Sequence, residues 1–122
     1  MILAFLLLLA GVHLEADARV RGRVIDLNIR FSNEGQPCWL QFPTTQLYEM
    51  ELNPGGLRWS DDSVFAKVKA RRAMGPGTWR LRERWILPPT IQPGDYTLRI
   101  WFMNDGEPRI ETTAPITIQP PR

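Results

Sequence analysis

The sequence is poor in the residues from which catalytic and metal sites are most often built. Its 122 residues include one cysteine, Cys38, and one histidine, His13. One cysteine cannot form an internal disulfide, and these two residues cannot supply the four ligands of a usual zinc site. Histidine is also the side chain that most often acts as general base in nucleophilic catalysis. We therefore expect a protein with no metal, no other cofactor and no enzymatic activity.

A strong excess of one charge is also missing. Fifteen basic residues stand against thirteen acidic ones, a net charge of +2. Arg80, Arg82 and Arg84 alternate along one predicted strand, and such a row could follow phosphates or another anionic surface. Acidic residues are interspersed among the basic ones, as on an ordinary solvated face. We expect no nucleic-acid partner, and an anionic surface remains the alternative use of these arginines.

The N-terminus lacks the basic residues that usually precede a signal-peptide core. Residues 2–12 are nonetheless an unbroken apolar run, too short to span a membrane, and Ala16 and Ala18 suit a signal peptidase. This predicts a signal peptide over residues 1–18, cleavage after Ala18, and an exported domain over residues 19–122 without a membrane span. His13 would be removed with it. A misassigned start and an uncleaved anchor are the alternatives. With a misassigned start the run would be a buried first strand or an artefactual extension, and the protein would be cytoplasmic.

No amphipathic helix is visible, and most of the chain alternates with the period of a strand. Eleven prolines and nine glycines separate short apolar runs. The pattern predicts strands over residues 24–31, 38–42, 48–52, 64–70, 79–87, 96–102 and 110–118, with a hairpin from residue 48 to residue 59. Seven or eight strands with frequent turns are typical of an all-β, two-layer antiparallel sandwich.

One tyrosine indicates the type of sandwich. Tyr96 follows the turn residues Pro93 and Gly94 at the start of a predicted strand. In immunoglobulin-like sandwiches a tyrosine at this place bonds back to the backbone of the preceding corner. The predicted fold is therefore immunoglobulin-like, although the paired cysteines of antibody domains are absent.

The stretch FPTTQLYEMELNPGGLRWS, residues 42–60, carries a family resemblance. A glutamine, a tyrosine followed by an acid, a glycine turn and a tryptophan with a serine occur there in order. This order resembles the signature of the intracellular proteinase inhibitor (BsuPI) family, and other positions of the chain extend the resemblance. The signature residues are Gln46, Tyr48, Gly56, Trp59, Phe65 and Tyr96.

The resemblance implies an immunoglobulin-like sandwich that inhibits a subtilisin-type serine protease. An inhibitor of this size does best by presenting a preorganised loop. The candidate contact loop is the segment after residue 70, because it precedes a turn and offers both basic and apolar side chains. Its residues are Arg71, Arg72, Ala73, Met74 and Gly75. An ordinary hairpin turn is the alternative interpretation of this segment.

A second function competes with inhibition. Immunoglobulin-like domains often serve as docking units, and Trp39, Trp59 or Trp101 would anchor a partner if exposed. The chain would then be an exported interaction module that binds another envelope protein without inhibitory activity. Glu49 and Glu51 are expected on the solvated face of their strand, where such spacing is common for surface charges.

Overall fold

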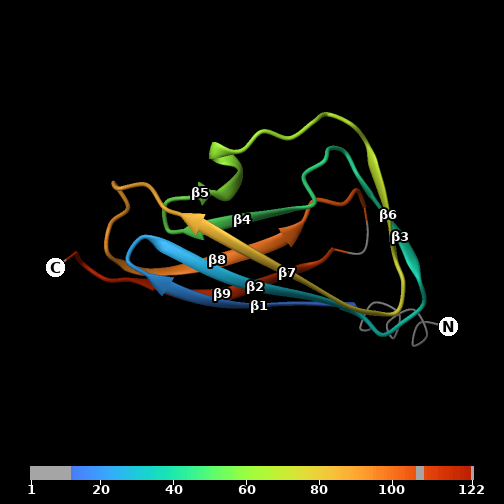
Figure 1. Cartoon of the computed structure of the whole chain (residues 1–122), viewed down its shortest axis with the longest axis horizontal. Coiled ribbons are helices and arrows are strands. Elements are labelled where there is room, and N and C mark those ends of the chain that lie inside the picture. The colour runs from blue at the N-terminus through green and yellow to red at the C-terminus, as the bar shows by residue number, and fades with distance from the viewer. Residues whose placement is uncertain (1–11, 107–108, 122) are drawn as a thin grey trace.

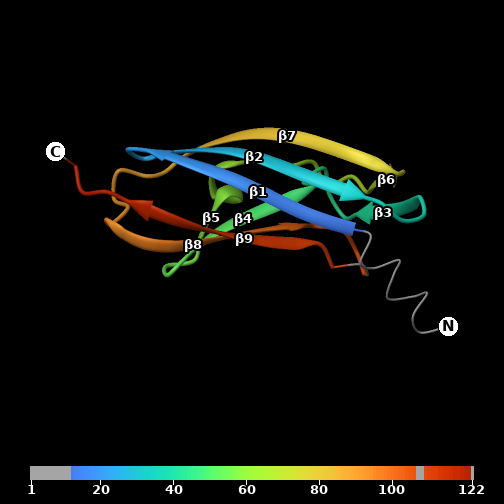
Figure 2. The same cartoon turned by 90° about the horizontal axis from the view of Figure 1, so that it is seen from below.

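Two layers of antiparallel strands make up the protein (Figures 1 and 2). The computed structural model describes residues 12–106 and 109–121. In this part of the chain the elements are β1 (Val12–Arg21), β2 (Val24–Asn33), β3 (Cys38–Phe42), β4 (Tyr48–Asn53), β5 (Leu57–Arg58), the 3-10 turn η1 (Trp59–Asp62), β6 (Ala70–Met74), β7 (Gly77–Ile86), β8 (Gly94–Phe102) and β9 (Glu111–Ile118). No helix within these residues is long and apolar enough to cross a membrane.

The two layers have the order expected of an immunoglobulin-like sandwich. One sheet has the order β1-β2-β7 and faces a second with the order β5-β4-β8-β9. Every strand pair is antiparallel. The Tyr96 hydroxyl at the start of β8 donates to the Gln92 carbonyl oxygen at 2.6 Å, the bond back to the corner that the sequence predicts. The all-β, immunoglobulin-like prediction is confirmed.

The core lies between the sheets and is built by alternation along the strands. In β2 the inward side chains Ile25, Leu27, Ile29 and Phe31 are buried while their neighbours face outward. In β8, Leu98 and Ile100 are fully buried, as the sequence predicts. Burying a large aliphatic side chain is worth about 1.5–3 kcal/mol, so these two strands alone supply much of the force that joins the sheets.

The boundary predicted after residue 18 does not match the fold. Residues 12–18 belong to β1, which pairs with β2 along its whole length, from Val12 opposite Asn33 to Arg21 opposite Val24. Leu14 is buried, and Ala16 and Ala18 pack partly buried against the core. Strand β1 lies between β2 and β9 and closes one side of the sandwich (Figure 2). The alternation of residues 12–20 is therefore a strand signal; residues 1–11 of the predicted signal peptide lie outside the described part of the chain.

The strand predicted over residues 64–70 is also wrong. Residues 63–69 form an irregular connection, in which Val64 and Val68 are exposed. Two of the four alternate positions of this segment, Ala66 and Ala70, are alanine, and alanine side chains bury too little apolar area to fix a strand on a sheet. The connection is held instead by Ala66, whose carbonyl accepts from Thr45 N at 3.0 Å while its N–H donates to Thr45 Oγ1 at 2.9 Å.

A bent ribbon extends the first sheet beyond the sandwich. Strands β2 and β7 pair up to Asn33 opposite Gly77, and β3 and β6 continue as a second pair from Cys38 opposite Met74. The second pair runs across one end of the sandwich (Figure 1). The buried Asn33 side chain secures the corner, because its Nδ2 donates to Gln36 O at 3.1 Å and to Met74 O at 3.0 Å. One amide thus joins both sides of the ribbon.

Removal of residues 1–18 should destabilise the domain. Compared with a chain that starts at Val12, a chain that starts at Arg19 loses most of β1 and the buried Leu14. We expect its free energy of unfolding in urea to fall by at least about 2 kcal/mol, the value for burying one leucine side chain. Equal stability of the two chains would show that β1 contributes nothing before residue 19.

Candidate protein-binding face

Two residues of the signature order in the 42–60 stretch, Gln46 and Ser60, bind a buried carboxylate. Glu49 is only 2% exposed, although its strand position predicts a solvated face. Its Oε1 accepts from Met50 N and Ser60 N, both at 3.1 Å, and its Oε2 accepts from the Ser60 hydroxyl and from Gln46 Nε2. Four hydrogen bonds compensate the desolvation of the charge. The prediction of a solvated Glu49 is wrong because η1 folds over this side of β4.

The other face of β4 carries a stack of aromatic rings. Tyr48 stacks on Trp59 with centroids 5.1 Å apart, and Trp59 packs against Phe65 at 5.7 Å. The Tyr48 hydroxyl donates to Glu83 of β7 and so connects the two sheets. Burial, with help from this carboxylate, raises the pKa of the Tyr48 phenol well above its usual value. Glu83, which interrupts the apolar side of β7 in the sequence, therefore has a partner in the opposite sheet.

The remaining signature residues shape the chain at other places. Gly56 has a φ of 67° in the turn between β4 and β5, a conformation that favours glycine. Tyr96 lies at its own corner, beside Gln92. The structure thus brings Gln46, Tyr48, Trp59 and Phe65 together as a structural cluster, but keeps Tyr96 apart.

The predicted contact loop is not a loop. Arg71, Arg72, Ala73 and Met74 belong to β6 and pair with β3, so only residues 75–76 connect to β7. Arg71 lies over the ring of Trp39, with its guanidinium carbon 4.3 Å from the ring centroid. Pairing with β3 fixes this backbone in a ladder, and it is therefore not free to present a substrate-like bulge. The loop prediction failed because β6 and β3 join only through tertiary pairing.

An apolar pocket of about 240 Å³ opens beside β6 and β7. Trp79 and Leu81 of β7 are each 39% exposed at its rim. Its lining residues are Phe31, Phe42, Leu47, Tyr48, Arg72, Ala73, Met74, Trp79, Leu81 and Phe102. We call this pocket and its rim the β6–β7 face. It holds three residues of the predicted loop and can accommodate an apolar side chain of a partner.

Four large apolar residues stand at alternate positions on one side of the strand predicted over residues 79–87: Trp79 and Leu81 near its start, and Trp85 and Leu87 at its end. The structure buries only the second pair, whereas Trp79 and Leu81 line the pocket of the β6–β7 face. Trp79 touches Phe31, with ring centroids 5.4 Å apart, and its other side is open. Glu83, the polar residue between the two pairs, is the position at which the exposed part of β7 gives way to the buried part.

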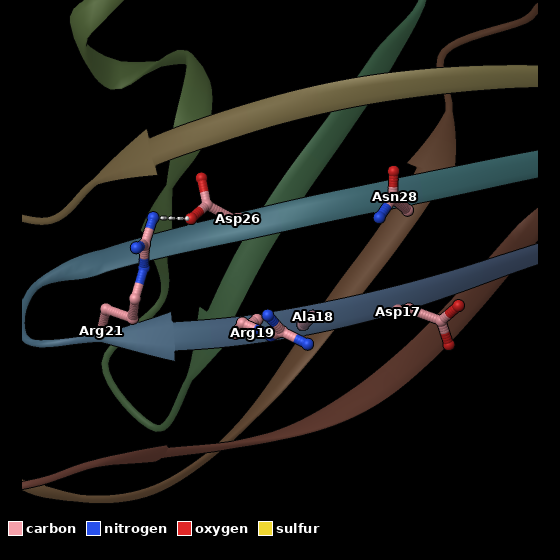
Figure 3. A pocket seen from close by; sticks show the side chains of 6 residues that line it. All are labelled: Asp17, Ala18, Arg19, Arg21, Asp26 and Asn28. Atoms are coloured by element: carbon pink, nitrogen blue, oxygen red, sulfur yellow. Dashed lines mark hydrogen bonds and ion pairs between the residues drawn. The ribbon is translucent and has the colours of Figure 1, made fainter.

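A wider polar hollow of about 570 Å³ lies on the outer face of β1 and β2 (Figure 3). Its acid Asp26 forms ion pairs with Arg21 and with Arg84, both at 2.9 Å. These two arginines lower the pKa of the Asp26 carboxyl. The opposite charges in this hollow balance each other, and its side chains are those of an ordinary exposed sheet.

The three tryptophans considered as anchors differ in exposure. Trp39 is 58% exposed on the outside of the β3–β6 ribbon. Trp59 is held in the aromatic stack, and Trp101 is covered by the guanidinium groups of Arg99 at 4.4 Å and Arg58 at 5.6 Å. Arg99 belongs to the second sheet and pairs with Glu111, so it does not extend the arginine row of β7.

Comparison with known proteins gives a family and a fold. A family model described as BsuPI, intracellular proteinase inhibitor, matches residues 12–107. Among solved structures, the crystal structure of Spo0M, a sporulation control protein from Bacillus subtilis, aligns with a TM-score of 0.56 and 9% sequence identity. The alignment covers 90% of this chain and 50% of the Spo0M chain. At that identity the likeness supports the fold alone. No curated protein matches the chain.

The prediction of export is wrong. The matching family is described as intracellular, and its model begins at residue 12, within the segment assigned to the signal peptide. The alternative function, an exported module that binds an envelope protein, depended on export and is therefore not supported either.

Replacement of the buried carboxylate of Glu49 should destabilise the domain. In Glu49→Gln an amide NH₂ would face donors at either position, so we expect a loss of about 1–3 kcal/mol in the free energy of unfolding. The matched control is Glu51→Gln, which removes an ion pair with the half-exposed Arg58 and should cost under about 1 kcal/mol. Similar costs in urea denaturation would contradict a special role for Glu49.

Alkaline pH should weaken the domain through Tyr48. Because burial raises its pKa in the folded state, the unfolded chain loses this proton first, and stability falls as the pH rises above about 10. Tyr48→Phe removes the hydroxyl that titrates and with it this pH dependence. We expect its urea stability to fall less steeply than that of the wild type, by up to about 1.4 kcal/mol per pH unit. Parallel curves above pH 10 would disprove the assignment.

Proposed function

Because the chain belongs to the intracellular proteinase inhibitor (BsuPI) family, we propose that it inhibits a subtilisin-type serine protease by binding through the β6–β7 face. The family assignment supports inhibition and a protease partner. The subtilisin-type target comes from the family resemblance, and the choice of face comes from the geometry of this chain. The role is binding, and no catalytic residue is assigned.

We choose the β6–β7 face because large apolar side chains are partly exposed around its pocket. Trp79 and Leu81 stand beside an opening of about 240 Å³, and half of the ten residues that line it are aromatic. Protein interfaces concentrate their binding energy in such aromatic anchors and pockets. Arg72 at the rim adds a charged group of the kind enriched at interfaces.

The structure favours docking over substrate mimicry. Substrate-like inhibitors present a preorganised extended loop, whereas Arg71–Met74 is paired in β6 and Gly75 lies in a two-residue connection. Docking of the sandwich beside the protease cleft would instead inhibit by keeping substrates out. The surface required of a small inhibitor, about 800 Å² per partner, exceeds the pocket and includes the neighbouring strands.

Titration of active proteases tests the proposal. Increasing amounts of the full chain are added to subtilisin and to trypsin, and hydrolysis of a chromogenic peptide is measured. We expect stoichiometric loss of the subtilisin activity. The double variant Trp79→Ala/Leu81→Ala should weaken inhibition about thirtyfold or more, which corresponds to about 2 kcal/mol at an interface anchor.

The matched control for this experiment lies on the same strand. Ile86 is 64% exposed near the other end of β7 and outside the β6–β7 face, so Ile86→Ala should inhibit like the wild type. Circular dichroism of both variants checks that the fold is retained. Full inhibition by a folded double variant would remove the β6–β7 face from the proposal. Absence of inhibition of any subtilisin-type protease would refute the proposed function and leave binding without inhibition.

A further inference from the structure

Strand β7 has a free backbone edge, on which we base a further inference about the binding partner. Strand β7 ends the three-stranded sheet, and only β2 pairs with it among the described residues. Every second N–H and C=O group along an edge strand points away from its one neighbour and is available to another chain. Residues 77–82 are six consecutive exposed positions. The length is sufficient for a short added strand, since most strands have about five or six residues.

The outer side of this edge carries uncompensated positive charge. Arg84 is paired with Asp26, and Arg30 is bound by Glu15 and Asp17, all at 2.9 Å. Arg80 and Arg82 lie between these pairs, opposite Arg30 and Asn28, and neither has a carboxylate partner within residues 12–106 and 109–121. They border an outer hollow of about 460 Å³. A partner that supplied carboxylates here would complete the row of ion pairs along β7.

The inner side of the same edge is apolar. Trp79 and Leu81 alternate with the two unpaired arginines and face the pocket of the β6–β7 face. Directly opposed residues of neighbouring strands share a face of the sheet. A strand added beside β7 would therefore place one set of its side chains toward the pocket and the alternate set toward the arginines.

We propose that the edge of β7 over residues 77–82 receives an extended segment of the partner as an additional β-strand, with apolar side chains alternating with acidic ones. Main-chain hydrogen bonds would supply affinity, and the two alternating side-chain sets would supply specificity. A shift of one residue would direct the acids into the apolar pocket. The alternation therefore fixes which set of side chains faces the pocket and which faces the arginines. The inference rests on the proposed function only for the kind of protein that carries the segment.

A different purpose for the arginines is to protect the edge. Charged residues on edge strands often prevent association between sheets. Protection alone predicts no preference for acidic over basic peptides beyond general attraction, and no dependence on the backbone N–H groups of a ligand. The experiment therefore measures the preference for acidic peptides and the dependence of binding on the peptide N–H groups, because these distinguish strand addition from edge protection.

The test uses the full chain and a capped synthetic peptide of about seven residues that alternates valine with glutamate, the length of a short strand. Binding is followed by chemical-shift changes of the β7 amides in NMR. One peptide version is N-methylated at the residues whose N–H groups would point toward β7, and another at the alternate residues. We expect the first modification to weaken binding at least about tenfold and the second to leave it unchanged, because only one set donates to the edge.

Charge variants test the other half of the proposal. Arg80→Ser/Arg82→Ser should weaken binding of the glutamate peptide about three- to tenfold at low salt, with a smaller effect at high salt. The matched control is Lys67→Ser/Lys69→Ser, which removes the same charge from the exposed connection before β6 and should bind like the wild type. A peptide that alternates valine with lysine should not bind the wild-type chain.

Equal binding of both N-methylated peptides, or shifts confined to residues outside β7, would overturn strand addition. So would equal losses in the two charge variants, since they would reduce the effect to net charge. The protease titration remains a separate measurement. Peptide binding with the expected pattern but without inhibition of any protease would support this inference while refuting the proposed function, and inhibition without peptide binding would do the reverse.

Discussion

Burial of alternating side chains between two sheets is the constraint on which the rest of the structure depends. The inward residues of β2 and β8 are almost completely removed from water, and their neighbours point outward. Because the side-chain period of a strand is two residues, this burial fixes the register of each strand and the face that it presents. The polar bonds are consistent with the same arrangement. Tyr48 reaches Glu83 across the layers, and two of the four hydrogen bonds to Glu49 come from Ser60 of η1.

The same constraint leaves β7 incompletely covered. Its second half contributes Trp85 to the core, whereas the residues of its first half are exposed and lead back to the β3–β6 ribbon. Trp79 and Leu81 are therefore partly open, and the backbone edge beside them lacks a partner strand within the part of the chain that the structure describes. This edge has apolar anchors on one side and, on the other, arginines with no carboxylate partner among the described residues. Such an edge is suited to binding a protein, which agrees with the family to which the chain belongs.

Particular residues show where sequence reasoning succeeded. Tyr96 bonds to its corner, Leu98 and Ile100 are buried, and residues 53–56 turn β4 into β5, because local turn chemistry and period-two burial act over a few neighbouring residues. The failures concern partners distant in sequence. Residues 12–18 resembled the end of a signal peptide until their pairing with β2 was known, and Arg71–Met74 resembled a loop until β3 was placed beside them. The expectation of a solvated Glu49 failed for a similar reason, because Ser60 of η1 binds this carboxylate in the folded chain.

The sequence by itself determined the all-β sandwich and the family, because alternation, turn residues and the signature order are properties of the chain read along its length. Only the tertiary structure decided which apolar residues of β7 stay exposed. Trp79 and Trp85 carry the same apolar signal and lie on the same side of one strand, yet one is open and the other is buried. Their exposure depends on which side chains pack against each of them, and those neighbours come from segments far apart in the chain.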